Sequence, residues 1–415
     1  MMDGNVVNLR VNSWYGDDEM ELSFPEIWDV RTKLMAGHGL PLLSEEEIRA
    51  RIRSPIRCRP LSEIAEGKET AVIVFSDMTR GDDPKAVLPF ILEELHAGGI
   101  QDDCITFISG LGAHGTMTRL DWAKKLGEEV VENYYVFNHN VYDHFEEMGV
   151  TSRGTPIEMN REFAAADVKV AIGGIIAHAF AGFGGGGKGV FPGVASLRSI
   201  EANHRMVAEE RPRGGCGYGV MAANVVRFDM EEAARLAGLD FKVDMVYNVD
   251  KRPLGVFAGD FVEAHRVGVD YAKEVLTTVP EEGCDVVVAN SYPGEAGKAS
   301  WPVGASLREG GTVVIVHSYV QGSVHHNIYG QFGRRHGGHL GRFPREGPAR
   351  SPFTKAGRMI YVGPWHSKRD MNPTTTWVKT WDEARKILEK IHGGNAKVAV
   401  YPYCALQMPP FPPGF

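Results

Sequence analysis

The 415-residue chain has few cysteines, no excess of positive charge and no long apolar run. Its five cysteines are scattered without a CxxC pair, which argues against a disulfide framework or a zinc ribbon and suits a reducing compartment. The net charge of −8 does not favour broad binding to nucleic acid or acidic membranes. No apolar run approaches the length of a membrane span, and residues 1–25 lack the apolar core of a signal peptide. We therefore expect a soluble, cytoplasmic protein with no nucleic-acid or membrane partner.

Apolar segments separated by polar loops predict an α/β protein with two domains and mainly parallel sheets. The chain is too long for one ordinary core, and residues 6–24 predict a β-hairpin around a Gly-Asp-Asp turn. Short apolar runs typical of buried parallel strands follow at residues 71–75, 104–109, 134–137, 167–173, 285–289, 312–316, 359–362 and 397–401. Helices are expected at residues 45–53, 119–126, 230–239, 262–276 and 382–392, with a further one ending near residue 97. Thr118 is the expected N-cap of the helix at residues 119–126. We place the domain boundary after residue 265, giving an N-terminal domain of residues 1–265 and a smaller one of residues 266–415.

Polar loops follow several of the expected strands of the first domain. These loops carry Asp, Arg, His and Gly, at residues 76–84, 110–118 and from residue 173 onward. In open α/β sheets, the loops at the carboxyl ends of parallel strands form the ligand crevice. The sequence therefore predicts that these loops converge on one site.

Residues 173–204 contain a glycine run, one lysine, two histidines and a proline-marked turn. Such glycine-rich loops usually exist because a backbone must approach something closely, so we predict that the segment binds a cofactor. Residues 182–188 fit the phosphate-loop spacing GxxxxGK, but Gly189 stands where that loop needs Ser or Thr for Mg²⁺. The run also fits GxGxxG, although four consecutive glycines satisfy almost any glycine pattern, and only Glu201 stands near the distance of a ribose partner. Contact between loop amides and a phosphate is expected on physical grounds.

His178, Lys188 and His204 bracket this glycine run. A lone histidine is more often a hydrogen-bonded structural residue than a ligand. Histidine can nevertheless shuttle protons or bind a metal near neutral pH, and a lysine in a dry glycine loop can lose its proton and act as a nucleophile. From the residues alone, both the structural and the catalytic or ligand role stay open for this group.

Two further loops present chemistry-bearing side chains after a strand. Asp77, Thr79 and Arg80 follow residues 71–75, and Arg is suited to bidentate binding of a carboxylate or phosphate; the alternative is a capping Asp beside a solvated Arg. His114 lies between glycines in the next loop. His325 and His326, in a Gly/Ser-flanked loop, could enter the site, but surface exposure is the simpler interpretation. The basic run of residues 334–350 is most often a solvated loop, with a lid over an anionic ligand as the sharper alternative.

Taken together, these motifs resemble the nickel-dependent lactate racemase family over nearly the whole chain. The shared stretches are Ser76-Asp-Met-Thr-Arg80, Gly112-Ala-His114 with Thr118, the run from His178 through Lys188 to Pro192-Gly193, and Asn203-His204. The order and spacing of His, Lys and His around the glycine run are the most specific part. The resemblance implies two α/β domains with the active site in the cleft between them. It also implies a cofactor, a nickel-pincer nucleotide, in which a pyridinium mononucleotide with two thio-acid arms holds the metal.

The resemblance also implies roles for individual residues. Lys188 matches the lysine that becomes covalently attached to the cofactor, and His204 matches the nickel ligand. His114 and His178 match a pair of acid/base histidines, and Arg80 matches the anchor of the substrate carboxylate. Further cofactor contacts are expected at Asp77, Thr79, Gly186, Gly187 and Pro192.

This chemistry is reasonable for a 2-hydroxy acid. Its C2–H bond is too weakly acidic for a simple side-chain base, so the hydrogen leaves as hydride to an electrophilic cofactor while a histidine takes the hydroxyl proton. Return of hydride to the other face of the planar 2-keto acid inverts the centre. Two histidines with a pKa near about 6.5 can exchange roles at neutral pH, while an arginine holds the carboxylate.

The second domain departs from the family pattern. Lactate racemases present a Gln and a Lys to the substrate after a glycine-tyrosine-proline turn, whereas Ser300 and Val303 stand at those places here, and Lys298 is out of register. These changes leave the cofactor side intact but favour a 2-hydroxy acid other than lactate, with Trp301 and the His325 loop shaping its pocket. The substrate contacts expected in this domain are Ser300, Trp301 and His325.

The sequence thus predicts an isomerase, a racemase or C2-epimerase of a small 2-hydroxy acid that uses a nickel-pincer nucleotide. The alternatives are a family member with another redox or hydrolytic step, and a carrier that binds the cofactor or a nucleotide without turnover. A homo-oligomer is compatible with the sequence.

Overall fold

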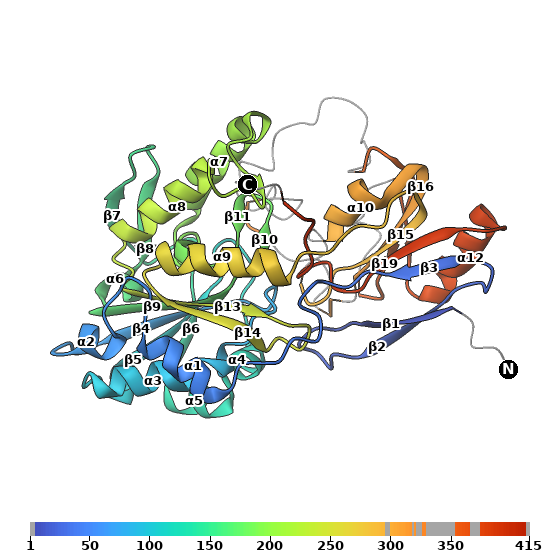
Figure 1. Cartoon of the computed structure of the whole chain (residues 1–415). Helices are drawn as coiled ribbons and strands as arrows, with labels where there is room; N and C mark the ends of the chain where they lie inside the picture. The colour runs from blue at the N-terminus through green and yellow to red at the C-terminus, as the bar shows by residue number, and fades with distance from the viewer. Residues whose placement is uncertain are drawn as a thin grey trace. The chain divides into compact units, whose positions relative to one another are not determined.

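The computed structural model describes residues 5–294, 299–317, 319–320, 326–328, 353–365 and 374–411 (Figure 1). The chain forms two compact units. Unit 1 comprises Met1–His38, Lys273–Val324 and Pro344–Pro410, and unit 2 comprises Gly39–Ala272, His325–Phe343 and Phe411–Phe415. Each unit has a mainly parallel sheet, so the expected α/β fold class is confirmed.

The main sheet of unit 2 has six strands in the order β14-β13-β9-β4-β5-β6. The strands are β4 (Ala71–Ser76), β5 (Ile105–Gly110), β6 (Tyr135–Asn138), β9 (Val168–Gly174), β13 (Phe241–Tyr247) and β14 (Pro253–Gly259). All neighbours pair in parallel except β13 and β14. The apolar run of β4 is buried along nearly its whole length, as a parallel strand covered on both faces requires.

Helices cover both faces of this sheet, with α1 and α3 on one side and α8 and α9 on the other (Figure 1). The helices of unit 2 are α1 (Glu45–Arg53), α2 (Leu61–Ala65), α3 (Leu88–Ala97), α4 (Arg119–Leu126), α5 (Glu128–Asn133), α6 (Arg161–Ala165), α7 (Leu197–Glu210), α8 (Val225–Leu236) and α9 (Glu263–Val275), the last of which runs three residues into unit 1. The expected N-cap Thr118 is present, and its hydroxyl and the side chain of Asp121 form a capping box at the start of α4.

Short strands carry the glycine-rich segment of unit 2. β10 (Ala177–His178) and β11 (Ala181–Phe183) form a tight hairpin, and β11 pairs in parallel with β12 (Gly217–Tyr218). A 3-10 turn over Gly186–Gly189 follows, and Val190 and Phe191 after it are fully buried. A separate hairpin of β7 (Phe145–Val150) and β8 (Pro156–Asn160) packs near α7.

Unit 1 contains a second six-stranded sheet, in the order β18-β17-β16-β15-β19-β3, with every pair parallel. Its strands are β3 (Asp29–Thr32), β15 (Cys284–Asn290), β16 (Leu307–Val316), β17 (Ala356–Val362), β18 (Thr375–Val378) and β19 (Lys397–Tyr401). The unit also holds the expected N-terminal hairpin, β1 (Val6–Arg10) with β2 (Glu19–Ser23), and the helices α10 (Trp301–Ser306) and α12 (Trp381–His392).

The grouping of residues differs from a single division after residue 265. The N-terminal segment lies in unit 1, because β3 pairs with β19 at the edge of that sheet. No local pattern in the sequence indicates this pairing, since the two strands are separated by almost the whole chain. The chain changes unit near residues 38 and 272.

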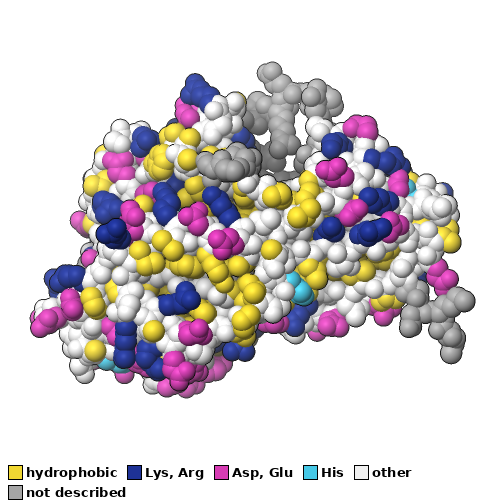
Figure 2. All heavy atoms as spheres, in the orientation of Figure 1, with side chains coloured by type: hydrophobic (Ala, Val, Ile, Leu, Met, Phe, Trp, Pro, Cys, Tyr) yellow, Lys and Arg dark blue, Asp and Glu magenta, His cyan; other side chains and the backbone are white. Residues whose placement is uncertain are grey.

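The described helices include none long and apolar enough to cross a membrane. On the face shown in Figure 2, acidic and basic side chains are interspersed, in keeping with the modest net charge of −8.

Candidate functional site

The loop after β4 places Asp77 and Thr79 in the interior of unit 2. Their exposed fractions are 5% and 6%. One carboxylate oxygen of Asp77 accepts the backbone N–H of Thr79 at 2.7 Å, and the other lies 2.8 Å from Nδ1 of His114. The hydroxyl of Thr79 is buried and has no hydrogen-bond partner among the described residues. The loop therefore presents an ordered carboxylate and an unsatisfied hydroxyl side by side.

Asp77 is ionised in this setting. Burial alone would raise the pKa of its carboxyl group, but the charge and hydrogen bond of His114, followed by the charge of Arg80, hold that pKa far below its usual range. An ionised carboxylate only accepts hydrogen bonds, so Nδ1 of His114 carries the proton that joins the two residues. In the neutral form of His114 the lone pair is therefore on Nε2.

Lys125, from α4, forms hydrogen bonds to the segment that contains Arg80. Its side chain is fully buried, and its ammonium donates to the carbonyl oxygens of Arg80 at 2.9 Å and Asp82 at 2.7 Å and to the hydroxyl of Ser76 at 3.2 Å. Burial lowers the pKa of this lysine, against the attraction of the nearby carboxylates. Lys125 thereby fixes the backbone from which Arg80 projects.

The His114 loop is joined to the glycine segment and to a third piece of chain. The backbone N–H of Gly112 donates to the carbonyl of Gly193 at 2.8 Å, next to Pro192. The backbone of His114 also forms an isolated antiparallel bridge with His326, and the two imidazole rings lie 5.3 Å apart, edge to face. His326 is thus a residue of the site region.

His178 ends β10, and the turn that follows controls its ring. Nδ1 of His178 accepts the backbone N–H groups of Phe180 at 3.1 Å and Ala181 at 3.2 Å. The ring of Phe180 lies edge-on to His178 at 5.7 Å and to His204 at 5.5 Å between centroids. Phe180 therefore stands beside both histidines that flank the glycine run.

A layer of buried charged side chains holds the glycine segment from inside. Arg227, from α8, donates to the carbonyl oxygens of Ala181, Phe183 and Gly185. Burial lowers its pKa to about 10, so it keeps its charge at neutral pH. Nε2 of His265 donates to Gly184 O at 2.7 Å, and burial followed by the charge of Arg227 lowers the pKa of that histidine well below its usual value.

Asp244 completes this layer from β13. It accepts the backbone N–H of Gly186 at 2.7 Å and pairs with Lys242 at 2.7 Å, with both side chains at most 1% exposed. Gly185 has φ of +76°, and a Cβ there would lie 2.6 Å from Asp244. A Cβ on Gly187 would meet Ala234 at 2.9 Å. Glycine is therefore required at some of these positions because a side chain would collide with the protein itself. Gly186 and Gly187 can contact a bound group only through their backbone.

His204 lies on α7 and is 8% exposed. Its Nδ1 lies 3.1 Å from Oδ1 of Asn203, whose amide nitrogen donates to Val226 O at 3.2 Å and to Asp229 at 2.8 Å. This orients the Asn203 oxygen as the acceptor, so His204 carries its proton on Nδ1 and has a lone pair on Nε2. Burial, and then the positive charges of Lys188 and His114, lower the pKa of His204 to about 3. The ring is neutral at physiological pH, as metal binding requires.

These electrostatic effects link segments that are distant in the sequence. Lys188 and His114 both act on His204, and His114 and Arg80 both act on Asp77. Unit 2 therefore brings together the predicted residues Asp77, Thr79, Arg80, His114, His178, Gly186, Gly187, Lys188, Pro192 and His204.

The remaining predicted residues are not in the described part of unit 2. Ser300 precedes α10 in unit 1, and the indole Nε1 of Trp301 is buried without a hydrogen-bond partner among the described residues. His325, Lys298 and the basic run of residues 334–350 fall outside the described residues.

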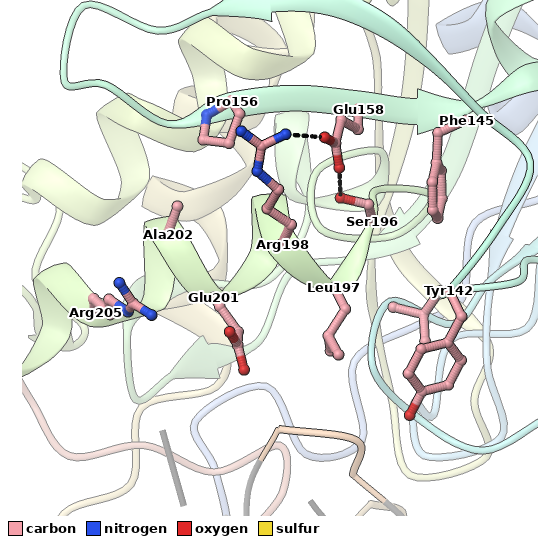
Figure 3. Close-up of a pocket in the computed structure, with 11 residues that line it drawn as sticks. Tyr142, Phe145, Pro156, Glu158, Ser196, Leu197, Arg198, Glu201, Ala202 and Arg205 are labelled. Carbon is pink, nitrogen blue, oxygen red and sulfur yellow. Dashed lines mark hydrogen bonds and ion pairs between the residues drawn. The ribbon is translucent and has the colours of Figure 1, made fainter. Parts of the chain in front are cut away.

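A hollow of about 660 Å³ opens beside α7 (Figure 3). Its wall includes Glu201 and Arg205, which neighbour His204 along the helix, and Tyr142 from the loop before β7. Glu158 closes one end through bonds to Arg198 and Ser196, both at 2.5 Å. Glu201, which stands near the distance of a ribose partner in the sequence, lines this hollow, whereas the predicted catalytic, cofactor-binding and metal-binding residues do not. The hollow therefore adjoins the candidate site through α7 and is not its centre.

Sequence reasoning missed the supporting residues Lys125, Arg227, Asp244 and His265. In β13, the alternation of Lys242 and Asp244 with apolar residues is typical of a half-exposed strand, although every residue of the strand is buried. Buried ionisable residues on apolar elements are the signal that could have found them.

Comparison with known proteins gives a consistent result. Residues 15–215 match the family described as the lactate racemase N-terminal domain. A lactate racemase from Lactiplantibacillus plantarum is 34% identical over 284 residues, which span 66% of this chain and 66% of that protein, about two thirds of its length. A lactate racemase from Thermoanaerobacterium thermosaccharolyticum is 28% identical over 329 residues, 77% of this chain and 76% of that protein.

Solved structures agree with the sequence matches. The lactate racemase apoprotein of T. thermosaccharolyticum superposes with a TM-score of 0.72 at 25% identity, over 97% of this chain and 99% of that one. A protein from Thermotoga maritima shares the fold, with a TM-score of 0.66 at 17% identity over 88% of this chain and 97% of that one. The fold and the matches together define the class, an isomerase of the racemase type. The chain belongs to the lactate racemase family.

Proposed function

We propose that this protein is a racemase or C2-epimerase of a 2-hydroxy acid, with a nickel-pincer nucleotide held by unit 2. The observation that carries the proposal is His204. Its ring is buried and neutral, Asn203 fixes its tautomer, and its Nε2 lone pair stands in the electrostatic range of Lys188. Histidine ligands of metals characteristically donate their second ring N–H to such an acceptor.

The side chains available as metal ligands also fit a metal that is held within a cofactor. The described residues contain no cluster of three His, Cys, Asp or Glu side chains suited to hold a metal ion. A nickel ion bound by His204 would therefore take its other ligands from the nucleotide. The buried, unsatisfied hydroxyl of Thr79 is a further group that a bound molecule would satisfy.

The same residues would hold the nucleotide. Lys188 is the point of covalent attachment, His204 the metal ligand, and the remaining contacts come from the loops at Asp77, Thr79, Gly186, Gly187 and Pro192. When bound, the group would supply an electrophilic acceptor for hydride from C2 of the substrate.

The protein's own residues bind the substrate and move its hydroxyl proton. Arg80, on the loop that Lys125 supports, anchors the carboxylate through paired N–H groups. His114, whose Nδ1 is held by Asp77, faces the reaction with its Nε2 lone pair and takes the proton of the C2 hydroxyl. His178 is the second histidine at the reacting oxygen. Anchoring by Arg80 keeps the acid bound while C2 is planar.

We propose a substrate other than lactate. The support is the second-domain loop, where Ser300 and Val303 replace the Gln and Lys expected for lactate, with Trp301 and His325 as further pocket residues.

The test is a panel of chiral 2-hydroxy acids incubated with protein produced together with the cofactor-synthesis enzymes. We expect inversion of one acid by chiral chromatography, one bound nickel and a mass adduct on Lys188, all reduced in His204→Ala. Nickel and adduct without inversion of any acid would leave a carrier, and protein without either would rule out the cofactor.

A further inference from the structure

The two catalytic histidines hold their protons on different ring nitrogens. In His114, Nδ1 is the donor, because its partner at 2.8 Å is the ionised carboxylate of Asp77. The other oxygen of that carboxylate is fixed by the N–H of Thr79. In the neutral ring, Nε2 of His114 is therefore the proton acceptor, and a positive charge formed on the ring would face a buried negative one.

His178 is held in the opposite way. Its Nδ1 accepts two backbone N–H groups, from Phe180 and Ala181. An amide N–H can only donate, so Nδ1 is unprotonated and the ring proton is on Nε2. A second proton on Nδ1 would point at two N–H groups and would remove both hydrogen bonds.

The turn that donates these two bonds is held firmly in place. The carbonyl of Ala179 belongs to the same peptide group as the N–H of Phe180, and it accepts from the side chain of Arg211 at 2.9 Å. The carbonyl of Phe180 accepts from the side chain of Asn224 at 2.9 Å. Because both peptide groups are fixed through their oxygens, their N–H groups cannot easily turn away from His178.

We propose that the two histidines have unequal roles: His114 with Asp77 transfers the proton, and His178 is a neutral N–H donor to the oxygen at C2. This inference rests on the proposed function. The O–H bond of the substrate breaks as the N–H bond forms at Nε2 of His114, whose positive charge is matched by Asp77, and the same proton returns when the hydroxyl re-forms. His178 polarises the oxygen without changing its protonation, as a neutral histidine does in triosephosphate isomerase.

The first test measures tautomers directly and needs neither nickel nor substrate. Long-range ¹H–¹⁵N spectra of the full-length protein with ¹⁵N-labelled histidine distinguish Nδ1–H from Nε2–H, and His114→Gln and His178→Gln assign the signals. We expect the proton on Nδ1 in His114 and on Nε2 in His178 at neutral pH. The same tautomer in both rings, or a charged His178, would overturn the inference.

The second test uses nickel-loaded enzyme and the glutamine variants. Glutamine keeps an N–H donor but cannot carry a proton. His178→Gln should retain activity within about 30-fold, whereas His178→Ala and His114→Gln should lose about 100-fold or more. Equal losses in the two glutamine variants would show a symmetric acid/base pair.

The two tests separate this inference from the proposed function. Racemisation together with a protonated Nδ1 on His178 would overturn the unequal roles and leave the racemase intact. The expected tautomers with no inversion of any 2-hydroxy acid would instead overturn the proposed function, and the roles with it.

Discussion

The ammonium group of Lys125 lies 2.9 Å from the main-chain carbonyl oxygen of Arg80. A side chain from a neighbouring helix thus sets the position of the residue proposed to hold the substrate carboxylate. The ammonium also donates to the hydroxyl of Ser76 and to the carbonyl of Asp82, so it holds this segment at several points.

Replacing Lys125 by methionine should therefore weaken substrate binding. The change leaves two buried carbonyl groups without donors, at a cost of about 1–3 kcal/mol each in unfolding free energy. We expect a lower melting temperature and a KM raised about tenfold, with a smaller effect on kcat. An unchanged KM in a folded Lys125→Met protein would show that Arg80 does not depend on this support.

Asn203 should control nickel affinity through His204. Asn203→Ala removes the acceptor for Nδ1, and loss of such outer partners typically weakens metal binding about 10–100-fold. Nickel content measured by plasma mass spectrometry, with melting curves beside it, checks this. Glu209→Ala, at an exposed position of the same helix, is the matched control and should bind nickel normally. Equal nickel in both variants would argue against the role of Asn203.

The buried pair of Lys242 and Asp244 should behave as a unit. Asp244→Asn leaves an unpaired ammonium beneath the glycine segment and should lower the unfolding free energy by about 3–5 kcal/mol. The double variant Lys242→Met/Asp244→Asn removes that charge and should recover most of the loss. Urea denaturation of Asp244→Asn, Lys242→Met and the double variant measures the coupling between the two residues. Losses of unfolding free energy that simply add would contradict this coupling.

His139 should make stability fall on the acid side. Nε2 of this buried ring donates to Ala195 O at 2.9 Å, and Nδ1 has no partner among the described residues. Burial lowers its pKa from 6.5 to about 4. Above 6.5 the ring is neutral in both states, whereas between 6.5 and about 4 only the unfolded chain takes up the proton.

The unfolding free energy should therefore drop by up to about 1.4 kcal/mol per pH unit from this residue as pH falls through that range. Denaturant titrations at several pH values check the slope. His139→Gln should flatten it by up to one proton, and His38→Gln, at an exposed position, should not. A slope unchanged in His139→Gln would contradict the assignment.

The sequence was sufficient to predict those elements whose structure is determined by a local pattern of residues. The continuous apolar run of β4 and the capping residue Thr118 were predicted from their own segments, and both are confirmed. The strand β3 could not be, because four residues without an apolar pattern become a strand only through pairing with β19. The charges of Lys242 and Asp244 likewise obscured β13, since their burial depends on each other and on Gly186.

For the site, the candidate residues could be selected by their type and spacing. Which ring nitrogen of each histidine carries the proton could not be predicted. His114 and His178 are equivalent as letters in the sequence. Their difference arises from what faces Nδ1, a carboxylate in one case and two peptide N–H groups of a turn in the other. The glycine run was a correct signal of close approach, yet at Gly185 and Gly187 the close neighbours are Asp244 and Ala234.

The pairing of β3 with β19 also sets an order of events during synthesis. Asp29 is made before the main sheet of unit 2, but its neighbour in the sheet of unit 1, Lys397, is made after it. Unit 2 has all six strands of its main sheet by Gly259 and can close that sheet while the chain is still growing. Unit 1 is thus a domain with a long insertion, and its strand β3 has its partner β19 only after that insertion has been made.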